Sequence, residues 1–199
     1  MNGELPVAVY DVEVLRGPDK VKDGWKNPHG MGFGTAVVYF ESADLYRFYG
    51  PDDLEKLKID LGQKYVVGFN TVNFDNKVVF GNTYRGLHPR EDKERECDLF
   101  LRIICSKFAV QSLRRAKKKV GKWKVFNGSC NLDAICKSTL GISKVGDGAL
   151  APVMISRNQW AKVFAYNLHD VRMTYKLYKF AGENGYVIDG DGNKIRLRV

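Results

Sequence analysis

The stretch Val7-Ala-Val-Tyr-Asp-Val-Glu-Val14 decides the fold that we predict for this chain. Its apolar beginning, rich in valine, is typical of a buried strand. Asp11 and Glu13 interrupt the apolar run, and because side chains alternate along a strand, both carboxylates project from the same face. Two buried carboxylates side by side repel each other and are costly to desolvate. Either a divalent cation between them relieves that cost, or the strand lies at a sheet edge with its polar face in water.

The size and composition of the chain indicate one globular domain spanning residues 1–199. A chain of 199 residues with 44% hydrophobic and 28% charged residues is long enough and apolar enough to form a core. No apolar run approaches the roughly 20 residues that span a bilayer, and the first residues lack the basic-then-apolar layout of a signal peptide. We therefore expect an intracellular, cytoplasmic protein without a membrane partner.

The charge of the chain favours a polyanionic partner. Its net charge is +9 and its pI is near 9.3, and nucleic acid is the first candidate for a basic protein of this kind. The cysteines show no Cys-x-x-Cys pair, so the spacing of a zinc site is absent. We expect reduced, mostly buried thiols at Cys97, Cys105, Cys130 and Cys136.

The order of the predicted elements indicates an α/β fold. Strands over Phe33–Phe40 and Leu45–Tyr49 follow the first strand as a meander, and strands near residues 64–68 and 97–100 then alternate with helices. This order predicts a mixed five-stranded central sheet, antiparallel in its first three strands and parallel afterwards, with flanking helices. Residues 185–199 are predicted to form a terminal β-hairpin.

The other predicted elements lie between and after these strands. Residues 15–32 and 145–152 are predicted to be loops, because both are rich in glycine and polar residues. The predicted helices cover residues 51–62, 77–84, 101–113, 131–140 and 158–181, and the last is either continuous or broken near residue 165.

Isolated acids occur at three points of this topology. Asp11 and Glu13 end the first strand. Asp75 follows a later strand, within Gly68-Phe-Asn-Thr-Val-Asn-Phe-Asp75. Asp170 lies in the last predicted helix, where Tyr166 is four residues earlier and therefore on the same helical face.

These three motifs, in this order, resemble the exonuclease motifs of the DEDD 3′–5′ exonucleases. That family has a ribonuclease H-like fold and includes the proofreading domains of DNA polymerases. The second motif is similar to that of family B polymerases, while the helix at Leu132-Asp133, the Gly146-Asp-Gly148 segment and the final motif resemble ribonuclease H-like exonucleases of phages and those found alongside helicases. The resemblance covers residues 7–185.

The last motif resembles the tyrosine branch of the family, the DEDDy exonucleases. Tyr166 fits that branch, whereas Ala165 stands where the other branch has a histidine, and we expect His169 on the helix surface. The chain departs from the family pattern at Val14, where threonine often follows the glutamate, and in the long segment 15–32.

The resemblance implies phosphodiester hydrolysis by two divalent metal ions, Mg²⁺ or Mn²⁺. These ions prefer hard oxygen ligands, which suits a site of carboxylates without histidine or cysteine. By resemblance, Asp11 bridges both ions, Glu13 and Asp170 complete one site, and Asp75 completes the other. Tyr166 orients the attacking water, because its ordinary pKa of about 10 makes it a poor base.

A dense basic cluster follows in the second half of the chain. It is either a solvated helix end and loop or a patch that contacts phosphates, and the tryptophan inside it favours the patch. Its residues are Arg114, Arg115, Lys117, Lys118, Lys119, Lys122, Trp123 and Lys124.

Four other polar residues have two interpretations each. Asn70 and Asn73 either place the 3′ nucleotide of a substrate or only shape the turn after the strand. Asp98 and Asp133 add acids near strand and helix starts, and for both we favour helix capping over a role in the site.

We therefore expect a metal-dependent 3′–5′ exonuclease acting on single-stranded nucleic acid, with DNA favoured over RNA. It would work alone or with a polymerase, helicase or recombination partner. One alternative is a structure-selective endonuclease or ribonuclease on the same fold. Another is a nucleic-acid-binding module without catalysis.

Overall fold

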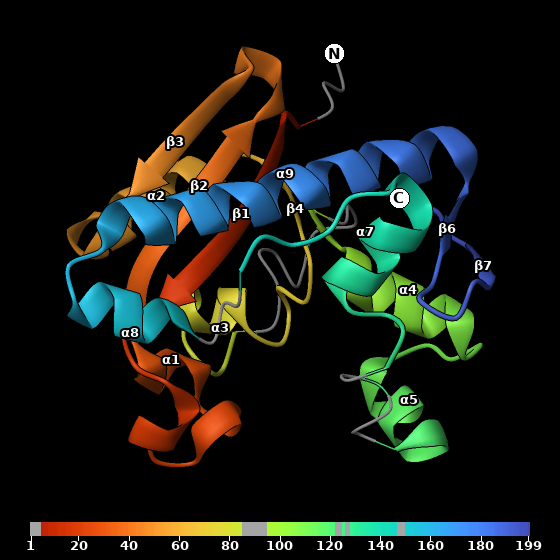
Figure 1. The fold of residues 1–199 in the computed structure, drawn as a ribbon, viewed down its shortest axis with the longest axis horizontal. Coiled ribbons are helices and arrows are strands. Elements are labelled where there is room, and N and C mark those ends of the chain that lie inside the picture. Colours follow the sequence, from red (N-terminus) through yellow and green to blue (C-terminus); the bar gives the residue numbers. More distant parts are fainter. Residues whose placement is uncertain (1–4, 85–94, 122–124, 126–127, 147–149) are drawn as a thin grey trace.

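A mixed five-stranded sheet forms the centre of the computed structural model, which describes residues 5–84, 95–121, 125, 128–146 and 150–199 (Figure 1). The strand order is β3-β2-β1-β4-β5. The pairs β1–β2 and β2–β3 are antiparallel, and the pairs β1–β4 and β4–β5 are parallel. The predicted α/β fold, an antiparallel meander followed by parallel strands, is confirmed. The strands are β1 (Val7–Val14), β2 (Phe33–Phe40), β3 (Leu45–Tyr49), β4 (Tyr65–Gly68) and β5 (Glu96–Asp98).

The central strand β1 is paired unequally on its two sides. It pairs with β2 along nearly its whole length, from Ala8 opposite Phe40 to Val14 opposite Phe33. Its pairing with β4 covers only Val7–Val9. The half of β1 that carries Asp11 and Glu13 therefore runs past the end of β4, which leaves one side of that half open to other groups.

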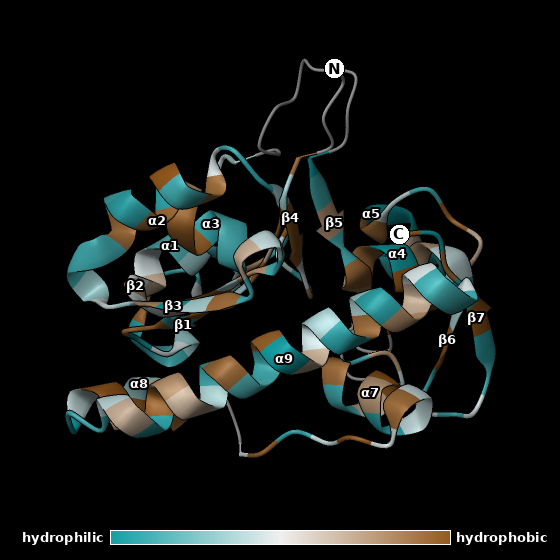
Figure 2. Cartoon of the chain, turned by 90° about the horizontal axis from the view of Figure 1, so that it is seen from above, coloured by the Kyte–Doolittle hydropathy of each residue, from teal (hydrophilic) through white to brown (hydrophobic). Residues whose placement is uncertain are grey.

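The two faces of the sheet are covered by different helices. On one face Ala8, Tyr10 and Val12 pack in a cluster with residues of α2 (Leu54–Leu61) and α3 (Asp75–Phe80). On the other face Val9 packs with residues of α4 (Leu99–Lys107), α7 (Leu132–Leu140) and α9 (Trp160–Asn184). Figure 2 shows α1, α2 and α3 on one side of the strands and α9 along the other. Because side chains alternate, Asp11 and Glu13 share the α9 face with Val9.

Several predicted boundaries are wrong. Residues 15–32 are not a plain loop but contain the short helices η1 (Pro18–Lys20), η2 (Gly24–Lys26) and α1 (Pro28–Met31). The predicted loop 145–152 overlaps the start of α8 (Ala151–Ser156). The helix predicted for residues 77–84 begins at Asp75 and ends at Phe80.

Two of the predicted helices differ in continuity. The helix predicted through residue 113 is two helices, because α4 ends at Lys107 and α5 (Leu113–Val120) starts behind its own cap, in which the Ser112 side chain accepts from the Arg115 N–H. By contrast, α9 runs without a break through Ala165. Its buried residues recur along one face for the full length of the helix, which explains why no break occurs. The short helices η3 (Glu41–Ala43) and η4 (Pro51–Asp53) flank β3.

The C-terminal hairpin is confirmed as β6 (Tyr186–Ile188) paired with β7 (Lys194–Arg196). In the turn of this hairpin, the fully buried Asp189 accepts hydrogen bonds from Asn193. Asp189 also forms an ion pair of 2.6 Å with Lys107. All four cysteines are free thiols, three of them buried. Within the described ranges, we find no helix that combines the length and the apolar character needed to cross a membrane.

Candidate functional site

Four carboxylates from three separate segments interact beside the free half of β1. Asp11 interacts electrostatically with Asp75, Asp170 and Glu13, and Glu13 interacts with Asp170 and Asp75. Two of them come from β1, one from the first turn of α3 and one from α9. The three acidic points that the sequence singled out are thus brought to one place.

The carboxylates of β1 are held in poorly solvated surroundings. Glu13 is 8% exposed, and Asp11 is partly buried. Oδ2 of Asp11 accepts a hydrogen bond of 2.8 Å from Nδ2 of Asn167, a fully buried residue of α9. This contact fixes the orientation of the Asp11 carboxylate and joins the sheet to the helix that covers it.

Asp75 fills the space that β4 leaves beside β1. Its Oδ1 accepts a hydrogen bond of 3.0 Å from the backbone N–H of Val12, in the part of β1 that β4 does not pair. Its side chain is buried at the start of α3, and Asn76 and Val78 beside it are buried as well. The open side of the strand thus accounts for the position of this carboxylate.

Tyr166 and Asp170 lie one helical turn apart on α9 and share a partner. The Lys144 ammonium group donates to the Tyr166 hydroxyl at 3.1 Å and forms an ion pair with Oδ2 of Asp170. Oδ1 of Asp170 is buried and has no hydrogen-bond partner among the residues that the structure describes. Asp170 therefore keeps one carboxylate oxygen available to a further donor or cation.

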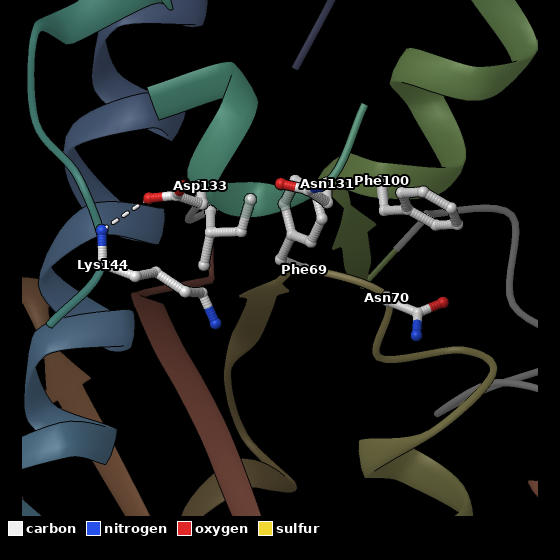
Figure 3. Close-up of a pocket in the computed structure, with 7 residues that line it drawn as sticks. Phe69, Asn70, Phe100, Asn131, Asp133 and Lys144 are labelled. Atoms are coloured by element: carbon white, nitrogen blue, oxygen red, sulfur yellow. Dashed lines mark hydrogen bonds between the residues drawn. The ribbon is translucent and has the colours of Figure 1, made fainter. Parts of the chain in front are cut away.

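Lys144 belongs to a segment that is fixed to two helices. The backbone N–H of Lys144 donates a hydrogen bond of 2.6 Å to Oδ1 of Asp133 in α7, which Figure 3 shows as a dashed line. The adjacent Ser143 carbonyl oxygen lies 3.0 Å from Nε2 of His169. Gly146, at a φ of +98°, comes so close to Tyr166 that a Cβ there would lie 3.4 Å from its ring.

One expectation for this region is corrected by these contacts. Asp133 does not cap α7, because Asn131 does so by accepting from the Ala134 N–H at 2.9 Å, which leaves Asp133 free to hold Lys144. His169, which we expected on the helix surface, is partly exposed, and its ring contacts the Ser143 carbonyl oxygen.

Burial and repulsion by neighbouring carboxylates disfavour the charged forms of Asp11, Glu13 and Asp75. Burial is the largest cause that raises the pKa of Asp11 and of Glu13 well above the ordinary values, and the neighbouring carboxylates raise them further. Lys144 opposes the shift in both cases. Burial also raises the pKa of Asp75 to about 7, against the lowering effect of the hydrogen bond from Val12.

The donor set has the chemistry of a site for Mg²⁺ or Mn²⁺. Carboxylate oxygens are the ligands these ions prefer, and Oδ1 of Asp170, which lacks a partner within the described part of the chain, is a buried acceptor that a cation would satisfy. As arranged here, however, no group of three or more His, Cys, Asp or Glu side chains among the described residues is placed to hold a metal ion. The positive charge that the structure puts among these carboxylates is the Lys144 ammonium group.

The two asparagines of the second motif shape the turn after β4. Asn70 adopts a left-handed conformation with a φ of 69°. Its Oδ1 accepts a hydrogen bond of 2.9 Å from Nδ2 of Asn73. Asp98 accepts from the backbone N–H groups of Asn70 and Val72, and it caps α4 through the Leu101 N–H. The capping role predicted for Asp98 is confirmed. A role of Asn70 and Asn73 toward a nucleotide stays a prediction.

A cavity of about 330 Å³ adjoins Lys144 (Figure 3). In the figure the lysine side chain extends from its loop toward β1, while two phenylalanine rings lie at the other end of the cavity. The cavity thus lies between Lys144 and the ends of β4, α4 and α7, and Lys144 is the residue that it shares with the carboxylate cluster. Its lining residues are Phe69, Asn70, Phe100, Asn131, Leu132, Asp133 and Lys144.

The basic cluster lies apart from the carboxylates, on α5. The helix carries Arg114, Arg115, Lys117, Lys118 and Lys119, and all but Lys117 are exposed. Figures 1 and 2 place α5 at the α4 end of the molecule, opposite α1 and α8. The remaining members of the predicted patch, Lys122, Trp123 and Lys124, lie outside the described residues.

Sequence patterns missed two residues of the site, Asn167 and Lys144. Asn167 lies inside the Tyr-x-x-x-Asp motif, and a polar side chain on a buried helical face could have identified it as a residue of the site. Lys144 carried no such signal, because its partner Asp170 is 26 residues away and the connection depends on how the intervening loop folds. No protein-family model and no curated protein matches this chain.

Proposed function

We propose that this chain is a metal-dependent 3′–5′ exonuclease of the tyrosine DEDD branch, with a ribonuclease H-like fold. The strand order β3-β2-β1-β4-β5 supports the fold assignment. The positions of the acids support the activity: two on β1, one directly after β4, and one on the long helix that crosses the sheet.

One observation carries the proposal. Four carboxylates interact with one another in poorly solvated surroundings, and burial raises the pKa of Asp11, Glu13 and Asp75. Such an arrangement opposes folding unless cations compensate it, and strongly shifted carboxylates of this kind are typical of catalytic sites. Asn167 and the Val12 N–H orient two of the carboxylates, which a site of fixed geometry needs.

The chemistry divides between the ions and the side chains. When bound, two divalent ions lower the pKa of the attacking water and neutralise charge that develops on the phosphate. Asp11 would hold both ions, Glu13 and Asp170 would complete one site, and Asp75 the other.

Tyr166 stays protonated at neutral pH, because burial raises the pKa of its phenol above the ordinary value. It therefore orients the attacking water by a hydrogen bond and does not act as a base.

The cavity beside Lys144 suits the end of a single strand. It offers the rings of Phe69 and Phe100 together with the amides of Asn70 and Asn131, and aromatic faces stack on bases of any sequence. The exposed cations of α5 suit the phosphates further along the strand. A single-stranded 3′ end, with DNA favoured, is the substrate we propose.

A comparison of linear and circular DNA tests this function against its alternatives. A linear single strand and a circular one of the same sequence are incubated with the protein and Mn²⁺. Loss of the linear strand with an intact circle is the expected result. Opening of the circle indicates an endonuclease on the same fold, and binding without cleavage of either substrate under any metal indicates a non-catalytic binding module.

A further inference from the structure

Lys144 brings a positive charge into the carboxylate cluster from outside the three acidic motifs. Its ammonium group pairs with Oδ2 of Asp170, whose side chain is 4% exposed, and donates 3.1 Å to the Tyr166 hydroxyl. The Lys144 side chain itself is 28% exposed. The same charge acts electrostatically on Asp11, Glu13 and Asp75. One lysine thus compensates part of the repulsion among all four carboxylates.

The backbone around Lys144 is fixed, while its side chain is long and flexible. Asp133 holds the Lys144 N–H, His169 contacts the Ser143 carbonyl, and the Ile142 N–H donates to the Cys136 carbonyl at 3.4 Å. Lys144 also lines the cavity of about 330 Å³, and Figure 3 shows its side chain extending among the other lining residues. The side chain therefore has space into which it can move by rotation about its own bonds, without refolding of the loop.

We propose that Lys144 is a tethered cation that occupies the position beside Asp170 in the metal-free protein, and that its ammonium group and a divalent ion exclude each other there. The inference rests on the proposed function, which requires a metal at Asp170. Two cations beside one carboxylate repel each other, so occupancy by one weakens binding of the other. Oδ1 of the same carboxylate, which has no hydrogen-bond partner among the described residues, is the acceptor at which an arriving ion first binds.

Metal affinity without nucleic acid tests the exclusion. Isothermal titration of Mn²⁺ compares the wild type with Lys144→Met, which keeps an unbranched side chain shorter by one heavy atom and removes its charge. Removing the competing cation is expected to tighten binding about tenfold, within the range usual for coupled sites. Lys162→Met is the matched control, because Lys162 is exposed on α9 and its loss changes the net charge equally. Equal or weaker Mn²⁺ binding by Lys144→Met overturns the proposal.

A second measurement uses the unmodified protein and does not depend on the folding of a variant. The amines are acetylated briefly with and without Mn²⁺, and the labelling of Lys144 relative to Lys162 is measured by mass spectrometry. Mn²⁺ is expected to increase the labelling of Lys144 severalfold, because the displaced ammonium loses its partners. Unchanged or reduced labelling overturns the proposal.

The two proposals fail in distinguishable ways. Tighter Mn²⁺ binding by Lys144→Met, with no cleavage of nucleic acid by any form of the protein, supports the tethered cation and refutes the nuclease. If the wild type cleaves nucleic acid and Lys144→Met binds Mn²⁺ with the same affinity as the wild type, only the tethered-cation proposal is refuted. Absence of Mn²⁺ binding by both forms refutes the two proposals together.

Discussion

Nδ2 of Asn167 donates a hydrogen bond of 2.8 Å to Oδ2 of Asp11, across 156 residues of chain. It links the helix that covers the sheet to the strand that carries the first acidic motif. Asn167 is fully buried, so the link is shielded from water. In metal sites, loss of a partner that orients a ligand in this way lowers metal affinity or activity by about 10–100-fold.

Asn167→Ala is therefore expected to weaken Mn²⁺ binding and cleavage by about 10–100-fold. The Asp11 carboxylate loses the donor that orients it, while the four carboxylates remain. The measurements are Mn²⁺ titration and the initial rate of oligonucleotide cleavage. Asn184→Ala serves as the control, because Asn184 lies at the exposed end of the same helix and bonds only locally, to the Phe180 carbonyl among the contacts described. Unaltered metal affinity in Asn167→Ala would show that the contact is structural.

Tyr166→Phe is expected to slow cleavage by about 10–100-fold with unchanged affinity for Mn²⁺, because the hydroxyl orients the water and does not hold a metal ion. The cleavage rate at saturating substrate and saturating Mn²⁺ measures the first effect, and Mn²⁺ titration measures the affinity. Tyr175→Phe is the matched control on α9, since the Tyr175 hydroxyl donates to Glu41 and not to the site. Equal rates for Tyr166→Phe and the wild type would remove Tyr166 from the mechanism.

The stability of the metal-free protein is expected to depend on pH through Asp75. Burial raises the pKa of Asp75 from 3.8 to about 7, so folding favours its protonated form. The stabilising contribution is complete below pH 3.8 and is lost as the pH rises through 7.

Asp75→Asn keeps an acceptor for the Val12 N–H and cannot ionise. In chelator it is expected to match the wild type near pH 4 and to exceed it at pH 8 by about 4 kcal/mol, or about 8–16 °C in Tm. Thermal unfolding across this pH range measures the difference. A gap between the two proteins that is the same at pH 4 and pH 8 contradicts the shifted pKa.

The exposed cations of α5 are expected to add affinity for a single strand without affecting the chemical step. In the double variant Arg114→Gln with Lys118→Gln, two phosphate contacts are expected to be lost. Each lost contact reduces the steepness of log K plotted against log salt concentration by about 0.7. The cleavage rate at saturating oligonucleotide stays the same. The control pair Lys56→Gln with Lys162→Gln removes two exposed charges from other helices. Identical salt slopes for both pairs would exclude α5 from the strand path.

The sequence predicted the sheet because its strands carry strong local patterns. Alternation in Val7–Val14 decided which face carries Asp11 and Glu13, and the structure pairs that strand with β2 and β4 as the meander and the following helices required. The helix boundaries were less predictable. Ser112 starts a separate helix by capping it, and the buried stripe of α9 overrides the local tendency toward a break at Ala165.

The site was predictable only where its residues lie in compact motifs. The acids were identified because charged residues interrupt apolar runs. The position of Lys144 results from three long-range contacts, to Asp133, Tyr166 and Asp170, and a loop rich in glycine encodes none of them in its local sequence. The side chain that compensates the carboxylates therefore emerges only from the folded chain.

The most direct test of the nuclease is cleavage of a 5′-labelled, 3′-tailed oligonucleotide, as DNA and as RNA, by the wild type and by Asp11→Ala, with Mg²⁺, Mn²⁺ or chelator. We predict a ladder of products that shortens from the 3′ end, needs the metal, and is absent with Asp11→Ala. Full-length oligonucleotide after incubation of the wild type with either metal, or an equal ladder with Asp11→Ala, would contradict it.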